Sequence, residues 1–254
     1  MLKFGRVNSF FFVLVLLVFT FQFPKYLYIF IFLCWLIVTT IGSFHIRWNY
    51  HVNALHSNPK TNKKQVAITF DDGPNPQFTL PILAILKKHN INATFFCIGK
   101  NIEEHPELFK QIANDGHIVG NHSYSHSNNF GFFSSNKVIN EINTTNKLIL
   151  KISNLNCNLF RPPFGVTNPA IKNAIKKTKH HVIGWSVRSL DTKIKEPREI
   201  LKRITKNLKA GDVILLHDTN KRTVVVLEQL LLFLQEHQFE AVTVDKLFEI
   251  EAYV

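Results

Sequence analysis

The feature that most constrains this chain is a regular alternation of apolar runs and amphipathic stretches between residues 65 and 244. Seven runs rich in apolar or β-branched residues predict strands: Val66–Phe70, Ala93–Ile98, His117–Gly120, Asn158–Arg161, His181–Val187, Asp212–His217 and Glu240–Val244. Six stretches between them predict helices: Thr79–His89, Pro106–Asn114, Lys137–Ile152, Pro169–Lys177, Pro197–Leu208 and Thr223–Gln235. This alternation predicts an α/β fold with a parallel sheet, open or closed into a barrel, whose functional side chains lie at the carboxyl ends of the strands.

The first 46 residues differ in composition from the rest of the chain. Val7 to Pro24 is a stretch of 18 residues without a charge, and Tyr26 to Ile46 is one of 21 in which only His45 can become charged. Each is close to the length of about 20 residues with which a helix spans a bilayer. Because Pro24-Lys25 interrupts the apolar sequence, we expect a membrane-spanning hairpin over residues 1–46. The alternatives are a single uncleaved signal-anchor helix, a secretory signal, or a buried helix pair of a soluble protein.

The remaining sequence divides into a short polar stretch and one domain. Residues 47–64 are rich in Asn, His, Ser and Lys and predict a linker, and residues 65–254 form the expected functional domain. The excess of Lys and Arg (30) over Asp and Glu (18) is typical of a solvated basic surface, and no basic stripe with stacking aromatics indicates nucleic-acid binding. Three scattered cysteines exclude a disulfide framework or a cysteine-type zinc site.

Polar side chains with chemical potential follow the ends of several predicted strands. The first strand runs directly into Asp71 and Asp72, two adjacent carboxylates followed by a Gly-Pro turn. Because adjacent carboxylates repel each other, one of a pair in a shared site tends to need a cation while the other is free to act as a base. His122 and His126 follow the third predicted strand, and their spacing allows both to reach one metal ion. A site with two histidines and one carboxylate leaves positions open for water and substrate.

Two further strand ends supply partners for this site. Arg161 precedes a rigid Pro-Pro turn and is suited to holding a carboxylate through its guanidinium group. His217 ends an apolar strand and is suited to donating a proton near neutral pH. Seen singly, Arg161 could be a structural ion pair and His217 a satisfied core histidine. Four such signals on four strand ends favour a common site.

Together these motifs resemble those of the polysaccharide deacetylase family, carbohydrate esterase family 4, over roughly residues 65 to 250. The resemblance implies a distorted (β/α)7-type barrel preceded by the membrane anchor. It implies Asp71 as the catalytic base and one divalent metal ion held by Asp72, His122 and His126. Zinc is the expected metal, and cobalt or another divalent ion could substitute.

The resemblance implies roles for five further residues. Arg161 would tether the base, His217 would be the general acid, and Asp191 would orient that histidine. The Phe164 backbone N–H would help to stabilise the oxyanion, and Leu215 would form a wall of the acetyl pocket. Many members have Trp directly after the aspartate of the fourth motif, where this chain has Thr192. This departure leaves the acyl and sugar preference of the pocket open.

The sequence therefore predicts a metal-dependent hydrolase that removes N-acetyl, or O-acetyl, groups from a polysaccharide or glycan such as peptidoglycan or a chitin-like oligosaccharide. The alternative is a catalytically inactive, membrane-tethered carbohydrate-binding protein. The expected partners are the acetylated glycan and the membrane, with no nucleic acid, and the sequence leaves the oligomeric state open. We expect the domain at the outer face of the membrane, in the cell envelope, although Lys and Arg near the ends of the hairpin favour the cytoplasmic face.

Overall fold

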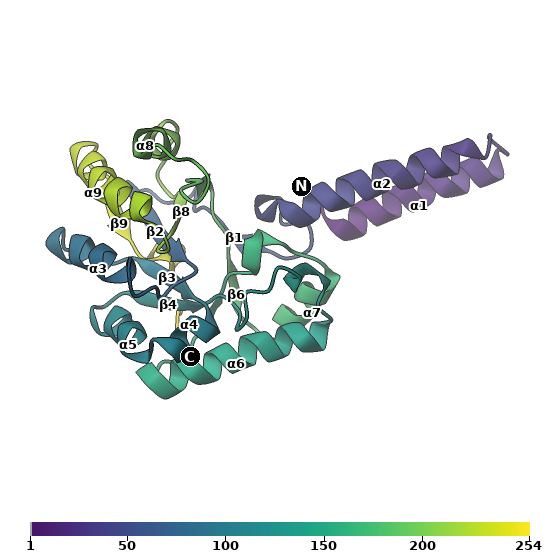
Figure 1. Cartoon of the computed structure of the whole chain (residues 1–254). Coiled ribbons are helices and arrows are strands. Elements are labelled where there is room, and N and C mark those ends of the chain that lie inside the picture. Colours follow the sequence, from purple (N-terminus) through teal and green to yellow (C-terminus); the bar gives the residue numbers. More distant parts are fainter. Residues whose placement is uncertain (1) are drawn as a thin grey trace.

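The N-terminal part of the chain is a helical hairpin that projects from the side of the domain (Figure 1). In the computed structural model, which describes residues 2–254, α1 (Phe4–Thr20) and α2 (Tyr26–Phe44) run antiparallel and are joined at Pro24. Most large apolar side chains that are exposed in the structure lie on these two helices. Among residues 2–254, α2 is the one helix that is long and apolar enough to cross a membrane, while α1 is apolar but shorter.

The domain is built on a curled, wholly parallel sheet of nine strands, which forms a half barrel. The strands are short: β1 Ala54–Leu55, β2 Gln65–Asp71, β3 Thr94–Cys97, β4 Ile118–Asn121, β5 Leu159–Phe160, β6 His181–Ile183, β7 Val187–Arg188, β8 Val213–His217 and β9 Glu240–Val242. Their order is β1-β6-β5-β4-β3-β2-β8-β7, and β9 pairs with the first residues of β2. The curl brings the carboxyl ends of the central strands toward one another.

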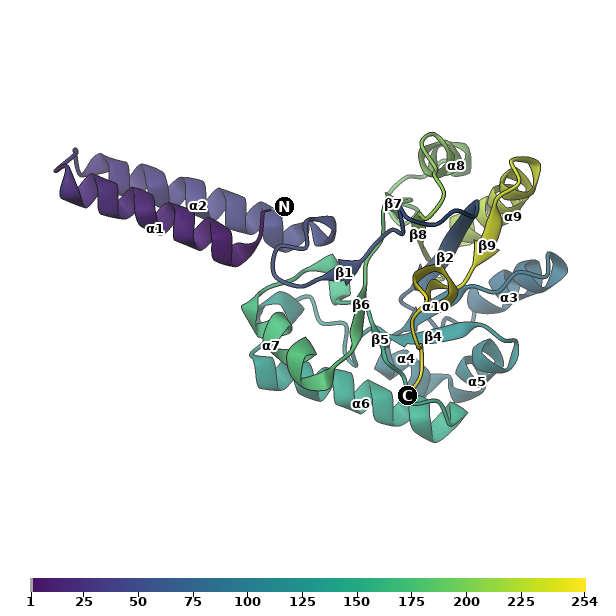
Figure 2. The same cartoon turned by 180° about the vertical axis from the view of Figure 1, so that it is seen from behind.

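Eight helices accompany this sheet in the described part of the domain, and Figures 1 and 2 show the longer ones around its outside. They are α3 Thr79–Lys88, α4 Gly99–Glu104, α5 Pro106–Asn114, α6 Ser135–Ser153, α7 Pro169–Thr178, α8 Pro197–Thr205, α9 Lys221–Glu236 and α10 Val244–Phe248. Side-chain caps start three of them, because Ser134, Asn168 and Asn220 accept hydrogen bonds from the first turns of α6, α7 and α9. Apolar side chains of α9 that recur at helical spacing, among them Leu227, Leu230 and Leu234, are buried in the main hydrophobic core.

The predicted barrel is confirmed in its architecture, with one strand resolved differently. The stretch His181–Val187, predicted as one strand, forms β6 and β7, which stand far apart in the order of the sheet. The chain leaves β6 at Gly184, whose N–H donates to the Leu55 carbonyl, and then crosses to the edge of β8.

The predicted linker over residues 47–64 contributes to the folded domain. It contains β1, which pairs with β6, and Ser57 bridges to Asp212. Val52 and Ala54 are buried in the main hydrophobic core together with Ile46. This part of the chain is therefore packed against the sheet and does not act as a free spacer.

The base of the hairpin is joined to the domain through several direct contacts. The Phe4 N–H donates to the Tyr50 carbonyl at 3.0 Å, and the Thr167 N–H donates to the Ser43 carbonyl at 2.9 Å. Ser43 Oγ is also 3.1 Å from His51 Nε2. A Cβ atom at Gly42 would lie 2.5 Å from the Tyr50 ring, so this position of α2 needs glycine for the close approach.

Candidate metal centre and active site

The parallel register of the sheet sets the predicted site residues side by side. Asp71, the last residue of β2, pairs with His217, the last residue of β8. On the other flank of β2 in the strand order, β4 ends one residue before His122, and β5 ends one residue before Arg161. Because the strands are parallel, these residues all leave the sheet at its carboxyl edge.

Asp72, His122 and His126 form a three-ligand cluster. Their candidate ligand atoms all lie within 4.8 Å of one another. Asp72 Oδ1 is 3.4 Å from Nε2 of each histidine. Two ligand atoms bound to one tetrahedral zinc ion are about 3.3 Å apart, so these separations suit such an ion. Asp72 Oδ1 is also buried without a hydrogen-bond partner, as expected of an atom whose partner is a cation. The three residues therefore fit a divalent metal.

The backbone around the cluster adopts uncommon conformations. Asp72, Ser123 and His126 have φ angles of 78°, 64° and 44°, in the left-handed region that residues other than glycine seldom occupy. Glu141 of α6 holds the loop formed by residues 122–126. Its carboxylate accepts hydrogen bonds from the N–H groups of Tyr124 and Ser125 and from Ser125 Oγ. Strained backbone held by its surroundings is typical of functional sites.

A hydrogen bond orients the first histidine of the cluster. His122 Nδ1 donates to the Arg161 carbonyl at 2.8 Å, which leaves Nε2 to face Asp72. Metal-binding histidines commonly have such a partner on the second ring nitrogen. The backbone of one strand end thus orients a side chain from its neighbour.

The electrostatics of the cluster favour a bound cation. Burial and the neighbouring His122 lower the pKa of His126 to about 4, so this ring is neutral near pH 7. Burial opposes ionisation of Asp72, but His122 and His126 outweigh it and hold the pKa of this carboxyl below its usual range. Burial also disfavours charge on His122, yet Asp71 and Asp72 raise its pKa. The carboxylates therefore favour a positive charge between them and the neutral His126 ring, which a bound metal ion would supply.

Asp71 is held from one side by a fully buried arginine. Arg161 Nη1 donates to Asp71 Oδ1 at 2.6 Å and to Thr69 Oγ1 at 2.9 Å. The other guanidinium nitrogens of Arg161 donate to the carbonyls of Ile183 and Gly184. These partners offset the cost of burying the charge. Asp71 Oδ2 remains beside the cluster, 3.7 Å from His122 Nε2.

His217 and Asp191 form a second hydrogen-bonded pair. His217 Nδ1 lies 2.7 Å from Asp191 Oδ1, and Asp191 Oδ2 accepts from the His217 N–H at 2.8 Å and from Thr223 Oγ1 at 2.6 Å. Burial acts to lower the pKa of His217, but the bond to Asp191 and the negative charge of that carboxylate raise it to about 9. His217 is consequently protonated at neutral pH, the state that a general acid needs.

The three remaining residues singled out from the sequence lie around this centre. Phe164 is 46% exposed, and its ring centroid lies 4.7 Å from that of His126. Leu215 is buried and precedes His217 by two residues in β8, so both side chains point to the same face of the sheet. Thr192, next to Asp191, is exposed.

One buried acid near the site was not predicted. Asp218 directly follows His217. Oδ2 of Asp218 accepts a hydrogen bond from Thr79 Oγ1 at 2.5 Å. Burial raises the pKa of Asp218 to about 7. A Cβ atom on Gly73 would lie 2.1 Å from Asp218 Oδ2, so glycine allows the Asp71–Pro74 turn to pack on this carboxyl. Asp218, Thr223 and Glu141 had no distinguishing signal in the sequence, since each sits in an ordinary polar context.

Comparison with known proteins shows which family this chain is similar to. The sequence model of the family described as polysaccharide deacetylase matches residues 58–183. A peptidoglycan-N-acetylglucosamine deacetylase of Bacillus cereus is 38% identical over 161 residues, which cover 62% of this chain and 57% of that protein. A second protein of that name from the same organism is 36% identical over 194 residues, covering 73% of this chain and 89% of the relative.

A solved structure agrees with the sequence relatives. The Bc1960 peptidoglycan N-acetylglucosamine deacetylase, in complex with an N-oxidanyl-benzamide, superimposes with a TM-score of 0.73 at 34% identity, over 78% of this chain and 94% of that one. The chain spans little more than half of the first relative, at 57%, and most of the second, at 89%. By its motifs, its half barrel and these relatives, the chain belongs to the polysaccharide deacetylase family.

Proposed function

We propose that this protein is a metal-dependent deacetylase that hydrolyses N-acetyl groups of a cell-envelope glycan, with peptidoglycan as the first candidate substrate. The observation that carries the proposal is the convergence of a metal-ligand cluster, a tethered carboxylate and a protonated histidine at one edge of the sheet. The names of the relatives support the substrate class. A non-catalytic carbohydrate-binding role is less well supported, because it would not require this complete set.

The cluster of Asp72, His122 and His126 would hold the metal ion in this proposal. A divalent ion bound there would polarise the acetyl carbonyl and ease the deprotonation of water. Zinc suits the donor set of two imidazoles and one carboxylate, and cobalt could replace it.

The protein groups divide the proton transfers between them. Asp71 would take a proton from the attacking water on Oδ2, since Oδ1 is occupied by Arg161. The substrate oxyanion that develops would accept a hydrogen bond from the Phe164 backbone N–H. His217 would then protonate the leaving nitrogen from Nε2, while its Nδ1–H remains on Asp191. That protonation is needed because an amide anion is a very poor leaving group.

The proposed location is the membrane, with the domain on the outer face. The apolar helix α2 supports an N-terminal anchor, with or without α1 as a second span. Peptidoglycan lies outside the cytoplasm, so the outer face gives the domain access to the proposed substrate.

The decisive experiment is acetate release by the full chain purified in detergent. Chitin oligosaccharides, peptidoglycan and acetylated xylan would be compared, before and after treatment with a chelator. We expect release from at least one N-acetylated glycan, its loss on chelation and its recovery on adding zinc or cobalt. Unchanged release in a sample shown to be metal-free would refute the metal-dependent mechanism. Sugar binding without acetate release would support the non-catalytic alternative.

A further inference from the structure

A groove of about 910 Å3 lies where the base of the hairpin meets the domain. One wall is the chain from Phe44 to Arg47, and the other includes Trp185 to Arg188 and α8. Its basic side chains are the most prominent feature of the lining. We call this hollow the basic groove; its cations are Arg47, Arg188, Lys202, Arg203, Lys206 and Lys209.

The positive charge of the basic groove is only partly neutralised within the protein. Among residues 2–254, none of its six cations forms an ion pair with a carboxylate. The lining contains two acids, Glu199 and Asp212. Asp212 is already engaged, since its oxygens accept from Ser186 Oγ and from the Lys209 N–H, both at 2.7 Å. The six cations outnumber the two acids around this hollow, so an anion bound there would be stabilised.

Two of the arginines are held at the groove by backbone contacts. Arg47 Nη1 donates to the Ser186 carbonyl at 3.2 Å, and Arg203 Nε donates to the Arg188 carbonyl at 2.8 Å. Each contact uses only part of the guanidinium group, which has five N–H donors. The remaining donors are suited to the oxygens of a phosphate group.

The position of the groove indicates where its anion comes from. Phe44, the last residue of α2, lines the groove and is 63% exposed. If α2 crosses the bilayer, its end lies at the depth of the lipid headgroups. The lining also includes apolar side chains beside the cations, among them Trp185 and Ile194. A mixed apolar and cationic lining at this depth matches the boundary between headgroup and acyl chain.

We propose that the basic groove binds the phosphate headgroup of an anionic phospholipid and so docks the domain on the membrane surface. The proposal rests on the membrane anchorage included in the proposed function. It is independent of catalysis, because none of the six cations belongs to the metal-ligand cluster, to the Asp71–Arg161 pair or to the Asp191–His217 pair.

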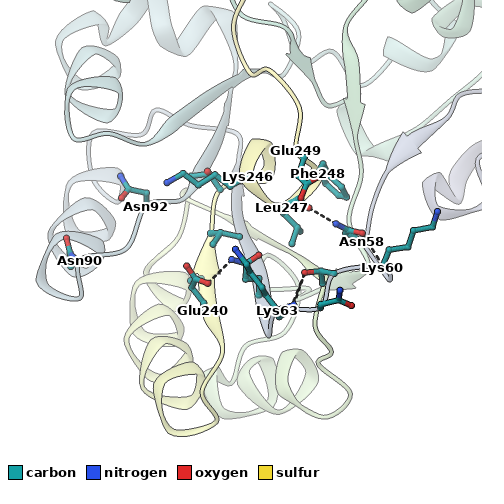
Figure 3. A pocket seen from close by; sticks show the side chains of 16 residues that line it. Asn58, Lys60, Lys63, Asn90, Asn92, Glu240, Lys246, Leu247, Phe248 and Glu249 are labelled. Atoms are coloured by element: carbon teal, nitrogen blue, oxygen red, sulfur yellow. Dashed lines mark hydrogen bonds between the residues drawn. The ribbon is translucent and has the colours of Figure 1, made fainter.

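A second hollow of the domain provides a matched control. It has a volume of about 940 Å3 and lies at the amino ends of β2 and β9, around Gln65 and α10 (Figure 3). It contains the exposed lysines Lys60, Lys63 and Lys246, but also Glu240 and Glu249, and no residue of the hairpin lines it. Reversing three lysines here changes the net charge of the protein as much as three reversals in the basic groove.

The test is a lipid titration of the full chain in detergent. Phosphatidylglycerol and phosphatidylcholine with the same acyl chains are added, and the retained lipids are counted by native mass spectrometry. We expect phosphatidylglycerol to be retained at about tenfold lower concentration than phosphatidylcholine. The K202E/R203E/K206E variant should lose this preference, the corresponding glutamine variant should lose part of it, and K60E/K63E/K246E should keep it.

Two outcomes would overturn the proposal. Equal retention of both lipids by the unmodified chain would show that no headgroup site exists, and equal losses in both charge-reversed variants would show a general charge effect. Circular dichroism melting curves identify any variant that fails to fold, and the glutamine variant then serves as the readout. Because the titration involves no turnover, an absence of deacetylation would refute the proposed function without changing this result.

Discussion

Asp71 and Asp72 are neighbours in the chain, but the structure gives their carboxylates different partners. Asp71 is paired with Arg161, whereas Asp72 faces the two histidines. The positive φ of Asp72, 78°, turns the chain between them and separates the directions of the two side chains. One carboxylate can therefore serve as base while the other serves as ligand.

We predict different losses for the two amide variants. Asp71→Asn should keep about one metal ion per chain and lose a factor of about 10²–10⁴ in kcat. Asp72→Asn should lose metal affinity by about 10-fold or more, because an amide oxygen replaces a charged ligand. Metal content by plasma mass spectrometry and acetate release rates measure both effects. Equal metal content in the two variants would contradict this division of roles.

The Asp191–His217 pair predicts a pH dependence. His217 must be protonated to act as the acid, and its pKa of about 9 keeps it so across neutral pH. The alkaline limb of kcat/KM should therefore lie near pH 9, with activity falling as pH rises through that value. Asp191→Asn removes the group that raises the pKa, so this limb should move down by at least about one pH unit.

The pH profile of kcat/KM from pH 5 to 10 measures this shift. Arg222→Gln offers a control in the same region, because Arg222 donates to the Asp191 carbonyl and does not touch its carboxylate. The control variant should keep the alkaline limb of the unmodified chain. An unchanged limb in Asp191→Asn would rule out Asp191 as the residue that sets the pKa of His217.

At this scale the sequence was informative about residues with distinctive chemistry. The metal-ligand cluster and the Asp71–Arg161 and Asp191–His217 pairs were predicted and lie together in the structure, while their catalytic roles remain predictions. Glu141 and Thr223 were not predicted. Their function is to hold other residues through hydrogen bonds from distant helices. Such contacts arise from tertiary packing, which leaves no local pattern in the sequence.

At the scale of elements, hydrophobic periodicity located the strands and the longer helices. Periodicity did not predict strand pairing that depends on residues distant in the sequence. The strand β1 lies in a polar stretch and forms because β6 offers an unpaired edge. The separation of β6 from β7 follows from the crossing at Gly184, which no periodicity shows. The short helices α4 and α10 were also missed, since five or six residues carry too little periodicity.

The burial of the segment before β2 predicts the shortest stable soluble domain. A chain beginning at Gln65 lacks β1 and loses the buried side chains of Ile46, Val52 and Ala54. Lost burial of this size costs about 3–6 kcal/mol, which corresponds to about 6–24 °C in Tm for a domain of this length. A chain beginning at His45 retains these contacts and is the matched control. Differential scanning calorimetry compares the two, and equal Tm values would show that the segment adds no stability.

At the scale of the whole molecule, the orientation in the membrane is a prediction with opposing indications. The N-terminus and the domain lie at the same end of the hairpin (Figure 1). Lys3, Arg6 and Arg47 lie near this end and Lys25 lies at the turn, a distribution that favours a cytoplasmic domain. Access to the proposed substrate, peptidoglycan, favours the outer face, and a large domain can be translocated largely regardless of charge.

We predict that the domain lies at the outer face of the membrane, and protease digestion tests this orientation. A tag placed after Val254 should be digested by protease added to intact spheroplasts. A cytoplasmic protein tagged in the same way is the control for membrane integrity. A tag that stays protected until the membrane is broken would assign the domain to the cytoplasmic side and would point to a lipid-linked or soluble sugar as substrate.

The direct attachment of the hairpin to the domain has a consequence for how substrate is found. Thr167 follows Phe164, which lies at the catalytic edge, by only three residues. The Thr167 N–H donates a hydrogen bond to the carbonyl of Ser43 in α2. With α2 in a bilayer, the catalytic opening would keep one height and one tilt above the lipid. Such an enzyme searches in two dimensions by lateral diffusion. It would reach newly made glycan close to the membrane, while older layers farther out would remain beyond its radius of action.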